Sequence, residues 1–174
     1  MASNHGIKSV TNVIYFNAIL YNAEKIERID EKLQPFFGLP VITTEEFFFN
    51  HTDYYNKEMG DHLVKYFAAY DIIKSPSSLP QYKIMLLDFE EKYMEGHSRV
   101  VNVDIGYLAL EKIVVASTKN FSHRLYIGED IYGDLQLIRK NEKYNSLPWT
   151  YKDYKQDFVI NFFENLRQVL LKSK

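Results

Sequence analysis

The sequence predicts a single α+β domain, residues 1–174, in which a mostly antiparallel sheet carries helices on one face. First, the predicted elements follow the order β-α-β-β-α-β-β-β-β-α, which contains the β-α-β-β-α-β order of a ferredoxin-like core. Second, 174 residues without a linker, repeat or low-complexity segment are most simply one domain. Third, hydrophobic residues make up 46% of the chain and charged residues 25%, as in ordinary globular proteins.

The first half of the chain supplies three predicted strands and one helix. Residues 10–20, 41–50 and 62–73 are rich in β-branched and aromatic residues, although a helix is the rival interpretation of the third segment. Asn22 is a plausible helix cap, and apolar residues at helical spacing follow it as far as Gly38, where the helix should end. The run Phe47, Phe48 and Phe49 is interpreted as a buried strand.

The second half should begin with a helix and end with one. Pro76 and Pro80 mark a helix start, and an apolar stripe at helical spacing runs from Tyr82 to about Met94. Strands are predicted at 99–103 and 113–117, joined by a segment that could also form a short helix, and a hairpin at 124–127 and 131–140. The last helix should start near Asp157, with Trp149 and its neighbours pinning it to the sheet.

Composition excludes several classes of protein. The absence of cysteine rules out disulfides, thiolate chemistry and zinc-ribbon sites, and suits a cytoplasmic protein. We expect no signal peptide, because the first residues lack a basic start followed by an apolar core, and no apolar run approaches the length of a membrane span. We therefore expect no membrane partner. A net charge of -2 gives no field that would hold nucleic acid, and we expect no nucleic-acid partner. The oligomeric state is open.

Three segments resemble a bacterial family of unknown function, the domain-of-unknown-function family 4416. They are HTDYYNKEMG at 51–60, VNVDIGYLALEKIVVASTKNFSHRLYIG at 101–128 and LPWTYKDY at 147–154. Family members read like FTDYYEKEMG, VNLDPGYLTLAKLVLATTKNYAHRIYLG and WTYPDY, in the same order and at similar spacing. The chain departs at Ile105 and Lys152, where proline is usual, and neither change removes a group that does chemistry.

The resemblance implies no established function. Members are sometimes labelled GTP-binding, but none of the seven glycines here opens a GxxxxGK[ST] loop, and there is no NKxD-type guanine reader.

Segment 117–124, STKNFSHR, is the strongest candidate for a ligand site, because it concentrates hydrogen-bond donors between two strands. Lys119, Asn120 and Arg124 are predicted to bind a phosphate or carboxylate, with Tyr107 and Tyr55 lining the pocket. The alternative is that segment 117–124 is a solvent-exposed turn whose charges prevent the edge of the sheet from associating with other chains. If Arg124 is a ligand contact, Arg124→Ala should weaken binding without unfolding the domain.

Acidic residues suggest a second kind of site. Asp53 and Glu58 could act as an acid/base pair, with His123 as a further catalytic group. Asp104 and Asp53 are weak candidates for ligands of a divalent metal, the one cofactor considered, and Glu58 and His123 would complete the set. The structural interpretation is that Asp53 caps a helical turn that Gly60 closes.

The sequence leaves three hypotheses open. The preferred one is a protein that binds a small anionic molecule, a nucleotide or phosphorylated metabolite. The alternative is a metal-assisted hydrolase or phosphoryl-handling enzyme, and a further alternative is a scaffold or assembly protein. If Asp53, Glu58, Asp104 and His123 share one cleft, the enzyme is favoured. If the basic groups line the pocket without them, binding is favoured.

Overall fold

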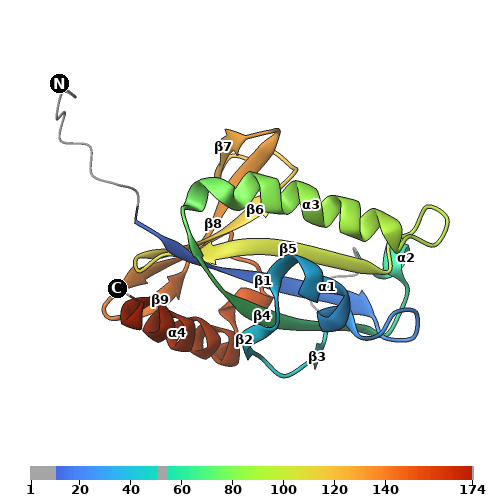
Figure 1. The fold of residues 1–174 in the computed structure, drawn as a ribbon, viewed down its shortest axis with the longest axis horizontal. Helices are drawn as coiled ribbons and strands as arrows, with labels where there is room; N and C mark the ends of the chain where they lie inside the picture. The colour runs from blue at the N-terminus through green and yellow to red at the C-terminus, as the bar shows by residue number, and fades with distance from the viewer. Residues whose placement is uncertain (1–10, 51–54, 174) are drawn as a thin grey trace.

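The computed structural model describes residues 11–50 and 55–173. Its strands are β1 (Val13–Asn22), β2 (Pro40–Thr43), β3 (Phe47–Phe48), β4 (Leu63–Lys74), β5 (Val101–Leu108), β6 (Lys112–Ser117), β7 (Arg124–Gly128), β8 (Ile131–Lys140) and β9 (Lys143–Ser146). Its helices are α1 (Ile29–Phe37), α2 (Asn56–Met59), α3 (Leu79–Lys92) and α4 (Asp157–Lys172), with 3₁₀ turns at Pro76–Ser78 and Asp153–Lys155. Figure 1 shows their arrangement.

All described strands join one antiparallel sheet, which confirms the predicted fold class. The order is β2-β4-β1-β5-β6-β8-β7, with β3 paired to β4 and β9 paired to β8. The four strands β2-β4-β1-β5, with α1 and α3 as crossovers, have the order of a ferredoxin-like core. The segment 62–73, for which a helix was the rival, forms strand β4.

The core has a layer on each side of the sheet, because every residue of β1 is buried. One face of β1, including Tyr15 and Ile19, packs with apolar residues of α1 and α3. The other face, including Phe16, packs with the buried stripe of α4. The expectation that helices occupy one face therefore holds for α1 and α3, whereas α4 covers the opposite face (Figure 1). A strand that is apolar on both faces needs cover on both, and periodicity does not say which helix supplies it.

Two other expectations are corrected locally. The segment 41–50 forms two short strands, and Phe48 in β3 is 77% exposed, so the run Phe47–Phe49 is not a continuous buried strand. The connector after residue 103 continues as β5 to Leu108 and forms no helix. Strand β9, with the polar sequence KYNS, was not predicted.

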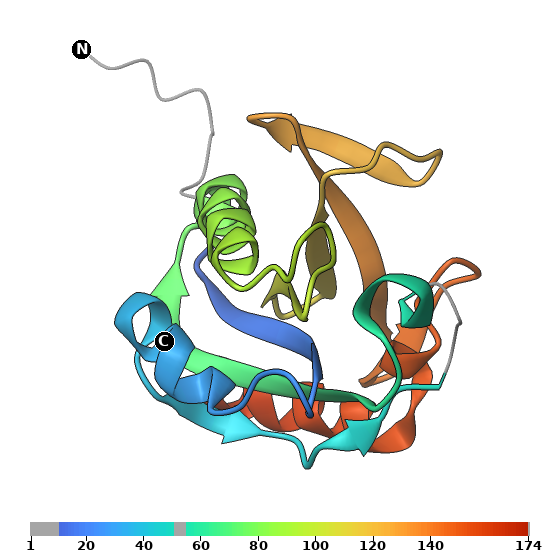
Figure 2. The ribbon, with the colours of Figure 1, turned by 90° about the vertical axis from the view of Figure 1, so that its right-hand side faces the viewer.

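The sheet is strongly curved. In Figure 2 the β6–β8–β7 part rises away from the β1–β4 part, and α4 lies beneath the latter. Among the described helices, none has both the length and the apolar composition that a bilayer span requires.

Candidate functional site

The candidate site lies where β5 and β6 separate. The two strands pair over residues 106–108 of β5, so the backbone of Val103 needs other partners. Glu90 of α3 accepts the Val103 N–H at 2.7 Å, and the Lys83 ammonium donates to the Val103 carbonyl oxygen at 3.1 Å. Two charged side chains of α3 thus replace a neighbouring strand and face the space between β5 and β6.

A cavity of about 590 Å³ occupies this region, a size typical of small-molecule sites. Its described cationic lining residues are Lys65, Lys83, Arg99, Lys119, Arg124 and Lys152. Its described carboxylates are Glu90, Asp104 and Asp153, and its rings are Phe49, Tyr55, Trp149 and Tyr151. The cavity therefore combines charged groups with aromatic walls.

Asp104 of β5 is held by cations and an amide. The Lys83 ammonium lies 3.1 Å from its Oδ1, and the Asn102 amide donates to its Oδ2 at 3.0 Å. Burial acts to raise the pKa of the Asp104 carboxyl, but the Lys83 and Lys65 ammoniums and these hydrogen bonds outweigh burial and lower it. Asp104 is therefore an ionised carboxylate at neutral pH.

Asp104→Asn should destabilise the protein at pH 7 by about 2 kcal/mol, because Lys83 loses its carboxylate partner. The lowered pKa of Asp104 means that its contribution is present above the pKa of the unfolded chain, about 4, and is lost as pH falls further. Chemical denaturation of wild type and variant at pH 7 and at pH 3 measures this difference. The exposed Asp71→Asn variant is the control. An equal difference at both pH values would contradict the ionic role.

Arg99 organises a second charged group. Its guanidinium makes two hydrogen bonds to Glu58, at 2.7 and 2.8 Å, and donates to Asn102 Oδ1 at 2.6 Å. The hydrogen bonds from Arg99 lower the pKa of the Glu58 carboxyl. Burial raises the pKa of Glu90, whose Oε2 lies 3.5 Å from the same guanidinium. Glu58 is thus engaged by Arg99 and is not among the described lining residues.

Lys65 and Asp153 form a buried ion pair in the cavity wall. Their Nζ and Oδ2 atoms are 2.7 Å apart, and both side chains are less than a tenth exposed. The Lys65 ammonium also lies 5.2 Å from the Phe49 ring centroid and 5.7 Å from that of Phe67, within the range of cation–π attraction. This pair joins β4 to the segment before α4.

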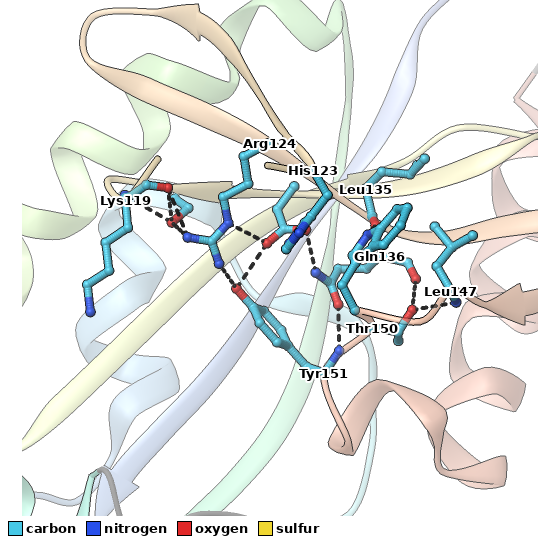
Figure 3. A network of polar contacts seen from close by, with 11 residues as sticks. Lys119, His123, Arg124, Leu135, Gln136, Leu147, Thr150 and Tyr151 are labelled. Carbon is cyan, nitrogen blue, oxygen red and sulfur yellow. Dashed lines mark hydrogen bonds and ion pairs between the residues drawn. The ribbon is translucent and has the colours of Figure 1, made fainter. Parts of the chain in front are cut away.

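Arg124 connects three segments around the cavity (Figure 3). Its Nε donates to buried Asp134 at 2.7 Å, and Nη1 donates to Ser117 Oγ and to the Lys119 carbonyl oxygen, both at 2.9 Å. Nη2 donates to the Tyr151 hydroxyl at 2.8 Å. Four hydrogen bonds within the protein leave the guanidinium little capacity for a ligand, because it has five N–H groups.

His123 stacks on Trp149, which lines the cavity, and is itself outside the described lining. Its ring stacks on the indole with centroids 5.0 Å apart and planes 14° apart, and its Nε2 is 3.6 Å from Asp134 Oδ1. The Trp149 Nε1–H donates to the Leu135 carbonyl oxygen at 2.7 Å. His123 is not among the described lining residues, so it supports the cavity wall through Trp149.

The structure brings only part of the predicted site together. Tyr55, Asp104, Lys119 and Arg124 line the cavity. Asn120 is exposed outside the described lining, and Tyr107 packs near Tyr15 on the α1–α3 face, with ring centroids 6.4 Å apart. Tyr107 points away because it differs by an odd number of positions from Asp104 in the same strand. Asp53 lies outside the described residues.

The predicted metal set does not assemble in the part of the chain that the structure describes. There, no group of three or more His, Asp or Glu side chains is placed to hold a metal ion. Glu58 is engaged by Arg99, His123 lies behind Trp149, and Asp104 is held by Lys83.

Sequence reasoning missed most of the charged lining: Lys65, Lys83, Glu90, Arg99, Lys152 and Asp153. Two of them carried a signal. Lys65 interrupts the apolar run of β4, and Lys83 lies four residues after Leu79 on the buried side of α3. A charged residue at a buried position of a periodic segment needs a partner, and the partner lies in the cavity.

Comparison with known proteins gives one match. The model of a family described as a domain of unknown function (DUF4416) matches residues 11–169. No curated protein and no solved structure matches the chain. The match spans most of the chain and includes all three segments that carried the resemblance. The chain therefore belongs to the DUF4416 family.

Proposed function

We propose that the cavity binds a small anionic organic molecule, a nucleotide or a phosphorylated metabolite. The supporting observation is the charge of its lining, in which six cationic side chains accompany three carboxylates. Asp104 and Asp153 are already paired with Lys83 and Lys65. Arg99 and Arg124 are likewise paired, with Glu58 and Asp134, which lie outside the described lining. We therefore assign the attraction of an anion to Lys119 and Lys152, since the field of cations is strongest within a concave site.

Two lysines at the cavity surface are suited to contact the anion. Lys119, after β6, and Lys152, before α4, are both exposed and both line the cavity. The loops that carry them are joined by Arg124, which bonds to the Lys119 carbonyl oxygen and to Tyr151. This connection fixes the two loops relative to each other before the ligand binds, which reduces the entropy lost on binding.

The test is calorimetric titration with ribose 5-phosphate and with nucleoside monophosphates. Lys119→Gln and Lys152→Gln should each weaken binding about tenfold, since a hydrogen bond to a charged group contributes about 1.5–3 kcal/mol. Lys140→Gln, an exposed change at the end of β8, is the control with the same loss of charge. Equal affinity of the Lys119→Gln/Lys152→Gln double variant and the wild type would contradict the proposal.

The enzyme alternative has less support. It requires the acidic groups and His123 to share one cleft, and of these Asp104 is the one among the described lining residues. The cationic lining favours binding over metal-assisted hydrolysis. A titration panel in which no phosphorylated compound binds would instead favour a scaffold role.

A further inference from the structure

We infer that the anion carries a planar heteroaromatic ring, as a nucleoside monophosphate does, and that this ring stacks on Trp149. This inference rests on the proposed anion-binding function and names the chemistry of the uncharged part of the ligand. It concerns the wall of the cavity formed by residues 149–153.

Trp149 is held rigidly although it is exposed. Its indole N–H donates to the Leu135 carbonyl oxygen at 2.7 Å, and the His123 ring covers one indole face. The His123 ring is in turn in contact with the Phe121 ring, with their centroids 5.1 Å apart. Trp149 nevertheless remains 37% exposed and lines the cavity. A ring that is fixed by contacts on one face and lines a cavity can stack on a ligand while losing little freedom when the ligand binds.

A purely structural role does not require this exposure. The hydrogen bond to Leu135 would anchor the loop, and the stack on His123 would bury one indole face. Neighbouring Thr150 already joins the same loop to β8 through a hydrogen bond from its hydroxyl to the Gln136 carbonyl oxygen. These contacts therefore do not account for the exposed part of the indole, and Trp149 lines a charged cavity.

The cationic groups lie within reach of a ring placed on Trp149. Lys152 follows Trp149 by three residues, so their Cα atoms are at most about 11 Å apart. Tyr151, between them, receives a hydrogen bond from Arg124, which also holds the carbonyl oxygen of Lys119 (Figure 3). One small molecule can therefore place a ring on Trp149 and a phosphate near Lys119 or Lys152. Phe49 and Tyr55 add apolar lining elsewhere in the cavity.

The chain offers a direct readout, because Trp149 is its single tryptophan. Adenosine and cytidine monophosphate should bind at least tenfold more tightly than ribose 5-phosphate, since stacking of a base on an aromatic side chain strengthens binding by about tenfold to a hundredfold. Both nucleotides should quench the tryptophan fluorescence, and ribose 5-phosphate should not. Calorimetry measures the affinities, so that variants without tryptophan can be compared.

Two substitutions separate stacking from support of the loop. Trp149→Leu should lower the affinity for adenosine monophosphate about tenfold and leave that for ribose 5-phosphate unchanged. Trp149→Phe keeps a ring but lacks the indole N–H, and it should retain most of the nucleotide affinity. If Trp149→Leu does not fold, the comparison of ligands on the wild type and on Trp149→Phe decides the question.

The outcomes distinguish this inference from the proposed function. If ribose 5-phosphate and the nucleotides bind equally and the fluorescence does not change, the ring inference is overturned while the anion site stands. If none of the three compounds binds, the anion site itself is overturned and the ring inference falls with it. Equal losses of affinity for ribose 5-phosphate and adenosine monophosphate in Trp149→Leu would assign Trp149 to loop support.

Discussion

Arg124→Met should lower the melting temperature by about 6–20 °C. Asp134, which has no exposed surface, would lose the cation 2.7 Å from its Oδ2. Removal of one partner of a buried ion pair costs about 3–5 kcal/mol, because the other charge stays buried. In a chain of this size each kcal/mol shifts the melting temperature by about 2–4 °C. Differential scanning calorimetry at neutral pH measures the shift.

The stability lost in Arg124→Met should exceed the stability lost when a surface ion pair is broken, and it should depend on the presence of Asp134. The matched control is Arg28→Met, which breaks an ion pair with Glu31; both side chains of this pair are at least 63% exposed. This variant should change the free energy of unfolding by about 0.5 kcal/mol or less. Adding Asp134→Asn to Arg124→Met removes the isolated carboxylate and should recover part of the lost stability. No recovery in the double variant would show that the other hydrogen bonds of Arg124 dominate.

This prediction reverses the expectation that followed from the sequence. In the sequence analysis, Arg124 was predicted to contact the ligand, and its substitution was expected to weaken binding without unfolding the domain. The structure instead places its guanidinium against Asp134, Ser117, the Lys119 carbonyl and Tyr151. A variant that keeps its melting temperature and loses phosphate binding would restore the original interpretation.

The fold could be predicted from periodicity where one chain segment determines its own structure. The stripe of α3 and the β-branched and aromatic residues of β4 are of this kind, and both elements were predicted, β4 with a helix as the rival. The side of the sheet that α4 covers depends on which face of β1 and β4 remains open after α1 and α3 have packed. That is a property of the assembled chain, and no periodicity within residues 157–172 encodes it.

The part of the site that could be predicted comes from polar residues that stand out in the sequence, such as Asp104 in β5 and the segment 117–124. Lys119 lies in a polar segment between strands, where binding groups concentrate, and it lines the cavity. Lys65, Lys83 and Arg99 come from a strand, a helix and a loop that are adjacent only because β5 and β6 separate. Alternation in β5 places Asn102 and Asp104 on one face, but no local pattern shows that β6 pairs with β5 only over residues 106–108.

The separation itself depends on a short pairing, and Gly106 is central to it. Gly106 pairs with Val115, and residues 106–108 of β5 hold β6 in place beside the cavity. A Cβ atom at Gly106 would lie 2.5 Å from the Phe16 ring and 2.7 Å from the Val114 carbonyl oxygen. The second contact is with backbone, so no change of side-chain rotamer relieves it.

Gly106→Ala should therefore destabilise the protein by about 3 kcal/mol or more, the upper part of the range for overpacked cores. Outside such a contact, alanine in a strand is at least as favourable as glycine, so the sign of the effect comes from the clash. Gly133→Ala in β8 is the control, because its nearest atoms are side-chain methyl groups of Ile127 and Val114 at 3.3 Å, which can shift. Chemical denaturation compares the two variants. If Gly106→Ala were as stable as Gly133→Ala, β6 would have to move away from β5 at low cost, and the cavity wall would be adjustable rather than fixed.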